Sequence, residues 1–484
     1  MDIKPSLFNL KSLKKVHIIG VGGTLMGAFA AFLRREGVEV TGSDQNIYPP
    51  MSDVLKNSGV DIFNGYHPEN LISQAQRPDL VVIGNVIRAD NEEAKAAIGR
   101  GYRYSSLPEA MEQLLLKETR NLVIAGTHGK TTTSSLLAYV LVCCGQNPSY
   151  FIGGVSQDLP LSFHVNSSQV HNSRYFVLEG DEYDTAFWDK VPKFNHYLPD
   201  EVILTSIEYD HADIYPDFQS VLKAFEGLVT RIRPQGKMIA CFDYPVIQEL
   251  VKNAKISVYS YGSSDSNARF TPGRMSFETG LTQFEVLDRQ KKVDEVTLSL
   301  PGHHNVLNAL AVWIQCQELG LDAQSVRSAL KSFQGVKRRQ EVRGEVQGVL
   351  VIDDFAHHPT AVRETLKALR YRYPQRRLIA VFEPRSATSR RKVFQKQYSE
   401  AFQEADQVYV AQPYDQSRIL EEEKFSTEEL IDDLKKAGKE SFLISSAEEG
   451  VALISKQLRS GDLVAVLSNG SFDGFITKLL DHLK

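Results

Sequence analysis

The chain of 484 residues contains only four cysteines. Cys143 and Cys144 are adjacent within an apolar stretch, whereas Cys241 and Cys316 are isolated. This pattern provides neither a disulfide framework nor the ligand spacing of a zinc site. A reducing compartment fits such a sequence, and we therefore expect a cytoplasmic protein.

Long hydrophobic runs are also missing. The N-terminal stretch MDIKPSLFNLKSLKK lacks the apolar core of a signal peptide, and no later stretch approaches the ~18 to 20 apolar residues of a membrane span. Neither sign of charge dominates, because 55 Lys and Arg face 60 Asp and Glu, a formal net charge of -5. We therefore expect no general affinity for nucleic acid and no stable membrane association.

The length predicts about three domains, at roughly 100 to 200 residues each. Solenoid repeats and low-complexity tracts are absent from the sequence. Apolar strands instead alternate with helical patterns, which predicts α/β domains over residues 1–118, 119–335 and 336–484. Residues 270–300 alternate in polarity and predict a few antiparallel strands, and the segment Gly335–Glu345 is expected to be a charged bridge.

The stretch AGTHGKTTT, residues 125–133, follows an apolar strand and precedes an expected helix. Backbone N–H groups and the positive end of the helix face such a turn, which suits a phosphate. Lys130 would add a point charge, and Thr131 a hydroxyl group for a metal ion. Only Thr127 and His128 separate the two glycines, where the usual Walker motif has four residues. An ordinary glycine turn with an exposed lysine therefore remains the alternative.

Two later apolar strands end in acidic residues. These are Glu179, Asp181, Glu182 and Asp184 after the first strand, and Asp210, His211 and Asp213 after the second. Both clusters are expected at one edge of a parallel sheet, where ligands of α/β proteins bind. Magnesium takes oxygen ligands and bridges phosphates, so carboxylates facing a Lys-Thr loop suit a Mg²⁺–ATP site. A solvated acidic loop is the alternative for either cluster alone.

The N-terminal turn GVGGTLMG resembles a dinucleotide fingerprint, with Asp44 as the ribose acceptor. Leu25 stands where the third glycine is required, which disfavours an NAD site. The turn could instead offer backbone N–H groups from Thr24 to Gly27 to another diphosphate, with Asp44 near a ribose or base.

Near the C-terminus, the tips DDFAHHP (353–359) and EPRSATSRR (383–391) gather carboxylates, imidazoles and guanidinium groups at strand ends. Arginine forks suit a substrate carboxylate or phosphate. The amides of PGHHNVLN (301–308) could read a base. A polar surface without catalytic function is the alternative for the adjacent histidines.

These segments, in this order, resemble the Mur ligases, the ATP-dependent amide-bond-forming enzymes of peptidoglycan precursor metabolism. The resemblance runs from GVGGTLMG through GTHGKTTT, EGDEYD, EYDHAD, GHHNVLN, VKRRQE and DDFAHHP to SNGSFDG. In that family the short loop is the ATP-binding form. The resemblance implies a Rossmann-like N-terminal domain for the UDP-sugar, a central P-loop ATPase domain and an α/β C-terminal domain that binds the incoming peptide and closes on ATP.

The resemblance also implies roles for individual residues. The implied ATP contacts are Gly126, Thr127, His128, Gly129, Lys130, Thr131, Thr132, His304, Asn305, Asn308, Arg339 and Asp354. The implied Mg²⁺ ligands are Thr131 and Glu179, with His211 at a second metal, and the implied catalytic residues are Lys130, Glu179 and His211. The implied UDP-sugar contacts are Gly22, Thr24, Leu25, Met26 and Asp44. The implied peptide contacts are His357, Arg385 and Ser386.

In the implied mechanism, a substrate carboxylate attacks the γ-phosphate of ATP to form an acyl phosphate, and an amine then displaces phosphate. Two members act on UDP-N-acetylmuramate. One adds L-alanine, and the other, a recycling enzyme, adds L-alanyl-γ-D-glutamyl-meso-diaminopimelate. The segments GTLMG, GSDQNIYPPMS, GDEYDTAFWDK and EPRSATSRR resemble the tripeptide-adding member. Arg385, Arg390 and Arg391 could bind the tripeptide carboxylates, although an exposed basic helix start is the alternative for the last two.

Three residues depart from the family pattern. Ser206 and Ala387 each replace a usual asparagine, which puts an ATP or metal contact and a peptide contact in doubt, and Gly180 replaces an alanine. Ser206 keeps open a further alternative, a nucleotide-binding regulatory protein without ligase chemistry. His211 and His357 are the candidates for the base that takes the amine proton. The expected oligomeric state is a monomer or a weak homodimer.

Overall fold

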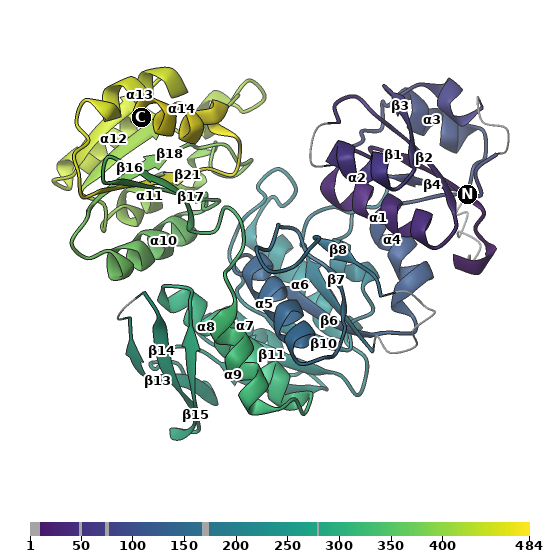
Figure 1. Ribbon diagram of the computed structural model, residues 1–484, viewed down its shortest axis with the longest axis horizontal. Helices are drawn as coiled ribbons and strands as arrows, with labels where there is room; N and C mark the ends of the chain where they lie inside the picture. Colours follow the sequence, from purple (N-terminus) through teal and green to yellow (C-terminus); the bar gives the residue numbers. More distant parts are fainter. Residues whose placement is uncertain (1–9, 48–50, 73–76, 167–173, 278–279) are drawn as a thin grey trace. The chain divides into compact units, whose positions relative to one another are not determined.

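A computed structural model describes residues 10–47, 51–72, 77–166, 174–277 and 280–484 (Figure 1). Residues 48–50 of the stretch GSDQNIYPPMS lie outside the described residues. The chain divides into two compact units. The first comprises Met1–Ile207, Gln219–Phe270 and Ala311–Ala329, and the second comprises Glu208–Phe218, Thr271–Leu310 and Leu330–Lys484.

The N-terminal part of the first unit contains a five-stranded parallel sheet with the order β3-β2-β1-β4-β5. The strands are β1 (Lys15–Ile19), β2 (Glu39–Asp44), β3 (Asp61–Asn64), β4 (Leu80–Ile83) and β5 (Tyr104–Ser105). The helices are α1 (Thr24–Arg35), α2 (Met51–Asn57), α3 (Glu92–Gly99) and α4 (Leu107–Met111), and α4 continues into a π-helical turn, Glu112–Leu116. Every residue of the central strand β1 is buried, as expected for a parallel strand covered on both faces.

The first unit also holds the strands that carry the glycine-rich loop. They follow the order β12-β11-β10-β6-β9-β7-β8. Their bounds are β6 (Arg120–Ala125), β7 (Ser149–Phe151), β8 (Phe163–His164), β9 (Tyr175–Gly180), β10 (Glu201–Leu204), β11 (Lys237–Cys241) and β12 (Ser257–Tyr261). The helices between residues 126 and 332 are α5 (Lys130–Cys143), α6 (Phe218–Arg231), α7 (Pro245–Val251), α8 (His303–Glu318) and α9 (Ala323–Ser332). The first half of α8, up to Leu310, belongs to the second unit.

Residues 270–298 form β13 (Phe270–Ser276), β14 (Thr282–Asp288) and β15 (Lys291–Leu298). β14 and β15 pair antiparallel. The antiparallel prediction is therefore confirmed for β14 and β15, whereas β13 pairs parallel with β12.

The C-terminal residues form a six-stranded sheet with the order β16-β17-β21-β18-β19-β20. Its strands are β16 (Glu341–Val346), β17 (Val349–Asp354), β18 (Arg377–Phe382), β19 (Gln407–Ala411), β20 (Glu440–Ile444) and β21 (Asp462–Leu467). β16 pairs antiparallel with β17, so the second half of the expected charged bridge is an edge strand rather than a linker. Its charged side chains suit an edge, where they discourage pairing with another chain.

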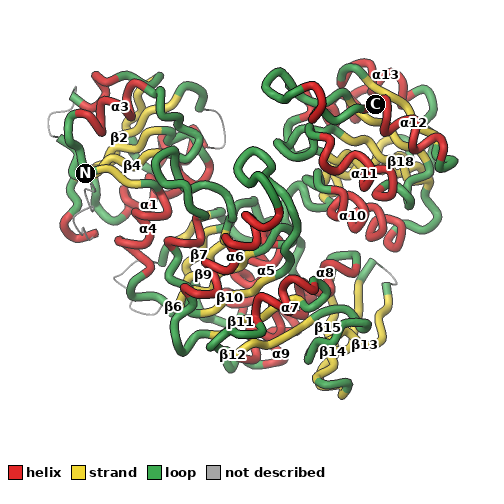
Figure 2. The backbone as a smooth tube through the Cα atoms, turned by 180° about the vertical axis from the view of Figure 1, so that it is seen from behind, coloured by secondary structure: helices red, strands yellow, loops and turns green. Residues whose placement is uncertain are grey.

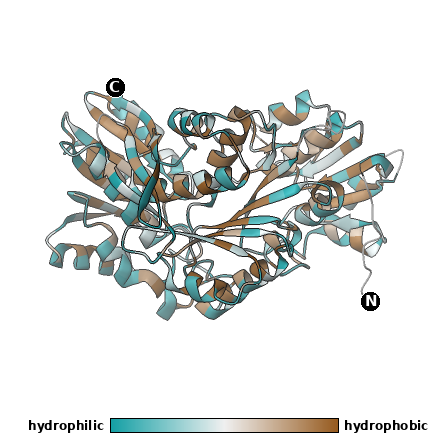
Figure 3. Cartoon of the chain, turned by 90° about the horizontal axis from the view of Figure 1, so that it is seen from below, coloured by the Kyte–Doolittle hydropathy of each residue, from teal (hydrophilic) through white to brown (hydrophobic). Residues whose placement is uncertain are grey.

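Side chains of alternate residues on β17, β18 and β21 point to two separate cores. The helices α10 (Pro359–Arg372), α11 (Gln395–Ala401) and α12 (Thr427–Lys436) cover one face, and α13 (Ala447–Ser455) and α14 (Phe475–His482) cover the other. The helices flanking the strands are visible in Figure 2, and the hydrophobic strands of the sheets in Figure 3. The α/β fold prediction is thus confirmed. Among the described residues, no helix combines the length and the apolar character needed to cross a bilayer.

Candidate active site

The glycine-rich loop begins where β6 ends, between two neighbouring strands. Ala125, the last residue of β6, lies beside Gly180 at the end of β9 and beside Leu204 at the end of β10. Parallel strands end at the same edge of a sheet, where ligands of such sheets bind. The strand order β10-β6-β9 therefore places Glu179 of β9 next to the loop.

Two glycines give the loop its shape. Gly126 has a φ of 136°, and Gly129 has a φ of 81° at the residue that precedes α5. A Cβ atom on Gly126 would lie 2.3 Å from Oγ1 of Thr205 and 2.8 Å from the backbone nitrogen of Ser206. Both the backbone angle and the close approach therefore require glycine at position 126.

Ser206, which replaces the usual asparagine of the family, holds the loop directly. Its carbonyl oxygen accepts a hydrogen bond from the backbone N–H of Thr127 at 3.1 Å, and its Oγ accepts one from that of His128 at 2.8 Å. The side chain is buried. The serine thus serves as a polar contact of the loop backbone.

We expect Gly126→Ala to lower the free energy of unfolding by about 3 kcal/mol, because it combines backbone strain with a collision against residues 205 and 206. Gly145→Ala is the matched control, since Gly145 also has a positive φ, 72°, but has no atom within 4 Å of its Cβ position. That variant should lose only about 1 kcal/mol. Urea denaturation without nucleotide measures both losses, and equal losses would show that the collision is not real.

Lys130, the first residue of α5, is buried in an acidic environment. Its Nζ donates to the carbonyl oxygen of Gly126 and to Oε2 of Glu182, each at 2.7 Å. Burial alone lowers the pKa of a lysine, but the charges of Glu182, Asp181 and Glu179 outweigh it and raise the pKa of Lys130. The ammonium group is therefore charged and already lies at the loop that is proposed to hold phosphates.

Glu179 accepts three hydrogen bonds, two from the start of α5 and one from the segment after β7. Its Oε1 accepts from Oγ1 of Thr131 at 2.7 Å, and its Oε2 accepts from the backbone N–H of Gly153 at 2.7 Å and from Oγ of Ser134 at 3.3 Å. Burial, followed by the charge of Asp181, raises the pKa of Glu179. A carboxylate and a threonine hydroxyl therefore meet beside the loop.

The charges around Glu179 fit a magnesium ion. Three buried carboxylates, those of Glu179, Asp181 and Glu182, face two lysines, Lys130 and Lys193. When all five groups are ionised, one negative charge is left over. A divalent cation beside Glu179 would offset this excess, and the hydroxyl and carboxylate oxygens present are the ligands that Mg²⁺ prefers.

His211 and Asp210 belong to the second unit. His211 has a φ of 54°, a left-handed conformation. Oδ1 of Asp210 accepts hydrogen bonds from Oγ1 of Thr388 at 2.6 Å and from the backbone N–H of His211 at 2.7 Å. His357 lies 3.7 Å from Oδ2 of Asp210, and its Nδ1 lies 3.0 Å from the carbonyl oxygen of Phe355. Thr388 lies inside the polar segment EPRSATSRR, and nothing in its sequence context marks it as the partner of Asp210.

Burial raises the pKa of Asp210, but the neighbouring histidines His357 and His211 outweigh it and hold the pKa well below its ordinary value. Asp210 is therefore an anion at neutral pH. Of the two candidate bases, His357 has its side chain directed at this anion.

Three predicted ATP contacts lie in the first turns of α8. Asn305 donates from Nδ2 to the carbonyl oxygen of Pro301 at 2.7 Å, and Asn308 donates to Oδ1 of Asn305 at 3.3 Å. Burial lowers the pKa of His304 to about 4, so its ring is neutral at neutral pH. Nε2 of His304 lies 3.3 Å from Nε2 of Gln340. This contact brings α8 and the Arg339 segment together.

Asp354, at the end of β17, is fixed by two backbone N–H groups. They belong to Gln340 at 2.8 Å and to Ala356 at 2.7 Å. Burial raises the pKa of Asp354, and the charge of the nearby Arg339 opposes this shift. The guanidinium carbon of Arg339 lies 5.0 Å from the ring centre of Phe355. The second unit therefore brings His304, Arg339 and Asp354 into one neighbourhood.

The three arginines of EPRSATSRR have different environments. Arg390 donates to the carbonyl oxygens of Tyr414 and Asp415, and Arg391 forms an ion pair with Glu423. These two side chains therefore hold the chain after β19, which favours a structural role over carboxylate binding. Arg385 differs, because its hydrogen bond among the described residues goes from Nη1 to Glu383, two residues before it in the chain.

Ser386 closes the turn that follows Arg385. Its Oγ accepts a hydrogen bond from the backbone N–H of Ser389 at 3.0 Å and lies 2.9 Å from Oγ of the same residue. Ala387, half-buried in this turn, contributes no polar side chain. Among the described residues, Arg385 is thus the arginine of this segment that makes no hydrogen bond to another loop.

The N-terminal turn is organised around Asp44. Oδ2 of Asp44 accepts from the backbone N–H of Gly22 at 2.8 Å, and the hydroxyl group of Tyr66 donates to Oδ1 at 3.3 Å. Burial and the charge of Asp44 raise the pKa of Tyr66 to about 12. The first turn of α1 carries the exposed Thr24, the half-buried Leu25 and the buried Met26. The five predicted UDP-sugar residues thus occupy one turn and the strand end beside it, with Tyr66 as an unpredicted neighbour.

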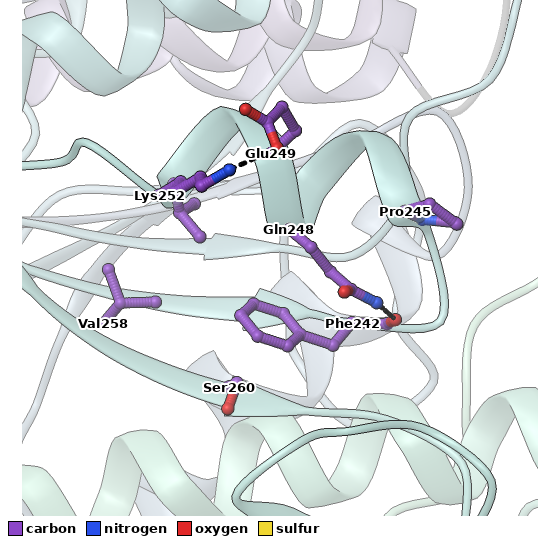
Figure 4. Close-up of a pocket in the computed structure, with 8 residues that line it drawn as sticks. Phe242, Pro245, Gln248, Glu249, Lys252, Val258 and Ser260 are labelled. Carbon is purple, nitrogen blue, oxygen red and sulfur yellow. Dashed lines mark hydrogen bonds and ion pairs between the residues drawn. The ribbon is translucent and has the colours of Figure 1, made fainter.

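A cavity of about 530 Å³ lies beside α7 (Figure 4). Phe242, Gln248, Lys252 and Ser260 are among the residues that line it, and Gln248 donates from Nε2 to the carbonyl oxygen of Phe242 at 2.6 Å. None of the predicted site residues lines this cavity. It therefore lies apart from the candidate site.

Comparison with known protein families gives three matches. The Mur ligase family, catalytic domain, matches residues 15–119, the Mur ligase middle domain matches residues 124–316, and the Mur ligase, glutamate ligase domain, matches residues 338–470.

Curated relatives match along nearly the whole chain. The UDP-N-acetylmuramate–L-alanyl-γ-D-glutamyl-meso-2,6-diaminoheptandioate ligase of Escherichia coli (strain K12) is 37% identical over 473 residues, which cover 97% of this chain and 98% of the relative. The ligase of the same name from Haemophilus influenzae is 34% identical over 98% of this chain and 100% of its own. UDP-N-acetylmuramate–L-alanine ligases from other bacteria are 30% to 32% identical.

A solved structure supports the same relationship. The murein peptide ligase of Psychrobacter arcticus is 32% identical and aligns with a TM-score of 0.70 over 97% of this chain and 98% of its own. The family models, the curated relatives and the Psychrobacter arcticus structure all match the parts of this chain that form the three sheets. The chain therefore belongs to the Mur ligase family.

Proposed function

We propose that the chain joins L-alanyl-γ-D-glutamyl-meso-diaminopimelate to UDP-N-acetylmuramate in peptidoglycan recycling, with ATP converted to ADP and phosphate. The observation that carries this proposal is the identity of 37% and 34%, over nearly full length, to relatives named for these substrates. Relatives named for L-alanine are 30% to 32% identical. The segments GDEYDTAFWDK and EPRSATSRR support the same choice.

The chemistry of the site suits an acyl phosphate mechanism. Phosphoryl transfer depends mainly on positioning and on neutralising the charge of the phosphates. Lys130 supplies a positive charge for this purpose when its ammonium group leaves Glu182 and contacts the phosphates. A bound Mg²⁺ ion, with Thr131 and Glu179 as its proposed ligands, would neutralise the phosphate oxygens, and His211 is the proposed ligand of a second metal ion. The carboxylate of UDP-N-acetylmuramate attacks the γ-phosphate, and the tripeptide amine then displaces phosphate. His357, held beside Asp210, is the proposed proton acceptor, and His211 is the alternative candidate in place of its metal role.

We assign the remaining roles on the same basis. The loop 126–132, the α8 residues and the Arg339–Asp354 pair bind ATP, the turn at Gly22 and Asp44 binds the UDP-sugar, and His357, Arg385 and Ser386 bind the peptide. The proposed domains are 1–118, 119–335 and 336–484, and both boundaries fall between sheets of the fold. A cytoplasmic location and a monomer or weak homodimer complete the proposal, and fractionation and light scattering test these two points.

An amine-dependent phosphate-release assay tests the proposed function. With MgATP and UDP-N-acetylmuramate present, we expect the tripeptide to stimulate phosphate release at least tenfold more than L-alanine does at equal concentration, about 1.4 kcal/mol of discrimination. Release with alanine alone would identify the alanine-adding activity instead. ATP binding without release under either amine would identify a nucleotide-binding protein without ligase chemistry.

A further inference from the structure

The guanidinium group of Arg385 lies in a slot between an aromatic ring and a glycine. Its central carbon is 3.9 Å from the ring centre of Tyr414. On Gly470, a Cβ atom would lie 2.1 Å from Cδ and Nε of Arg385. The arginine therefore packs against the backbone of the turn after β21 and against the ring of Tyr414.

One edge of the same guanidinium is fixed by a buried carboxylate. Nη1 of Arg385 donates to Oε1 of Glu383 at 3.1 Å, and Oε2 of Glu383 accepts a hydrogen bond from Oγ of Ser468. Glu383 is buried. Within the described part of the chain, Nη2 of Arg385 has no hydrogen-bond partner, so the guanidinium is fixed on three sides and keeps donors available.

Tyr414 is held in place although its side chain is not buried. Its backbone N–H donates to the carbonyl oxygen of Pro384 at 3.0 Å, and its carbonyl oxygen accepts from Nη1 of Arg390 at 3.1 Å. About half of the residue, 49%, is exposed. Hydrogen bonds of its backbone to the turn of Arg385 therefore set the position of the ring, rather than burial in a core.

We propose that Tyr414 is a positioning residue for the acceptor peptide, because its ring and Gly470 orient Arg385 so that the free edge of the guanidinium binds a peptide carboxylate. This inference rests on the proposed function. An arginine fork binds a carboxylate through two parallel hydrogen bonds, which requires a defined plane. The stacked tyrosine defines that plane, and Nη2, which Glu383 does not use, supplies the donors for the peptide carboxylate.

The test compares Tyr414→Ala, Tyr414→Leu and Tyr414→Phe in the phosphate-release assay at varied tripeptide concentration. We expect alanine and leucine to raise the KM for tripeptide about tenfold with kcat within about twofold, and phenylalanine to stay within about twofold because it retains the ring face. The KM values for ATP and UDP-N-acetylmuramate should not change. Leu420→Ala, at a site 62% exposed after the same strand, is the matched control and should resemble the parent.

A double-mutant cycle separates positioning through Arg385 from any other effect. Arg385→Ala should raise the KM for tripeptide, and adding Tyr414→Ala to it should have no further effect. An unchanged KM in Tyr414→Ala and Tyr414→Leu, an equal defect in Tyr414→Phe, or the same added factor in the Arg385→Ala background would each overturn the proposal. Thermal unfolding checks that the variants are folded, and the leucine variant retains bulk where alanine does not.

The parent enzyme is assayed first, so that the two failures can be distinguished. A parent without tripeptide-dependent phosphate release refutes the proposed function. An active parent whose tyrosine variants behave like Leu420→Ala refutes the positioning role alone.

Discussion

Lys130→Ala should lower kcat by about a thousandfold or more, because it removes the cation that neutralises the transferred phosphoryl group. Phosphate release at saturating tripeptide measures this loss. Lys223→Ala, which removes an exposed lysine of the same unit, is the control and should retain parental activity. An alanine variant within tenfold of the parent would show that Lys130 does not contact phosphate in the reaction.

The same substitution should also reduce stability. Lys130 is the ion-pair partner of Glu182, so its loss leaves that buried carboxylate without its counter-charge. Breaking a buried ion pair from one side costs about 3 kcal/mol or more. Lys130→Arg keeps the charge, so it should recover most of the stability but little of the activity, because its planar fork cannot reproduce a point charge at the same place. Thermal unfolding and turnover, measured together, separate the two effects.

This stability cost shows where the sequence is insufficient. The pattern of AGTHGKTTT predicts a strand, a turn and a helix, and the structure has β6 and α5 at those positions. The same pattern predicts that Lys130 is an exposed loop lysine. In the structure only 11% of its side chain is exposed, and it lies beside Glu182. The local sequence pattern predicts the turn. It does not predict the partner of Lys130, because Glu182 is 52 residues away and reaches the lysine only through the order of the strands in the sheet.

The arginines of the C-terminal segment illustrate the same limit. Arg385, Arg390 and Arg391 are equivalent as sequence letters, since all three follow one strand and all suit a carboxylate. Their different roles are set by Tyr414 and Glu423, which reach them through the chain after β19. Composition and spacing cannot rank side chains whose partners come from another loop. The expected bridge 335–345 is a further case, because its pairing with β17 makes half of it a strand.

Glu179→Gln should lower kcat about a hundredfold and raise the magnesium concentration required for half-maximal activity about tenfold, because a neutral amide is a much weaker Mg²⁺ ligand than a carboxylate. Magnesium titration of phosphate release measures both. Glu226→Gln, at an exposed position of α6, is the control. A magnesium titration that coincides with that of the parent would remove Glu179 from the ligand set.

Without magnesium, the same variant should be at least as stable as the parent. The pKa of Glu179 is raised in the folded state, first by burial and then by Asp181, so its contribution to stability is present below the unfolded-state pKa and is lost as pH rises through the folded-state pKa. At neutral pH the raised pKa of Glu179 therefore lowers the stability of the fold, and the amide removes this cost because its oxygen can accept from the Gly153 N–H while its NH2 group donates to the hydroxyl oxygen of Thr131. Thermal unfolding with and without Mg²⁺–ADP should show a parent that gains stability on binding and a variant that gains much less. A variant less stable than the parent in the absence of magnesium would mean that the Glu179 carboxylate stabilises the fold. The excess negative charge at the loop would then no longer indicate a cation site.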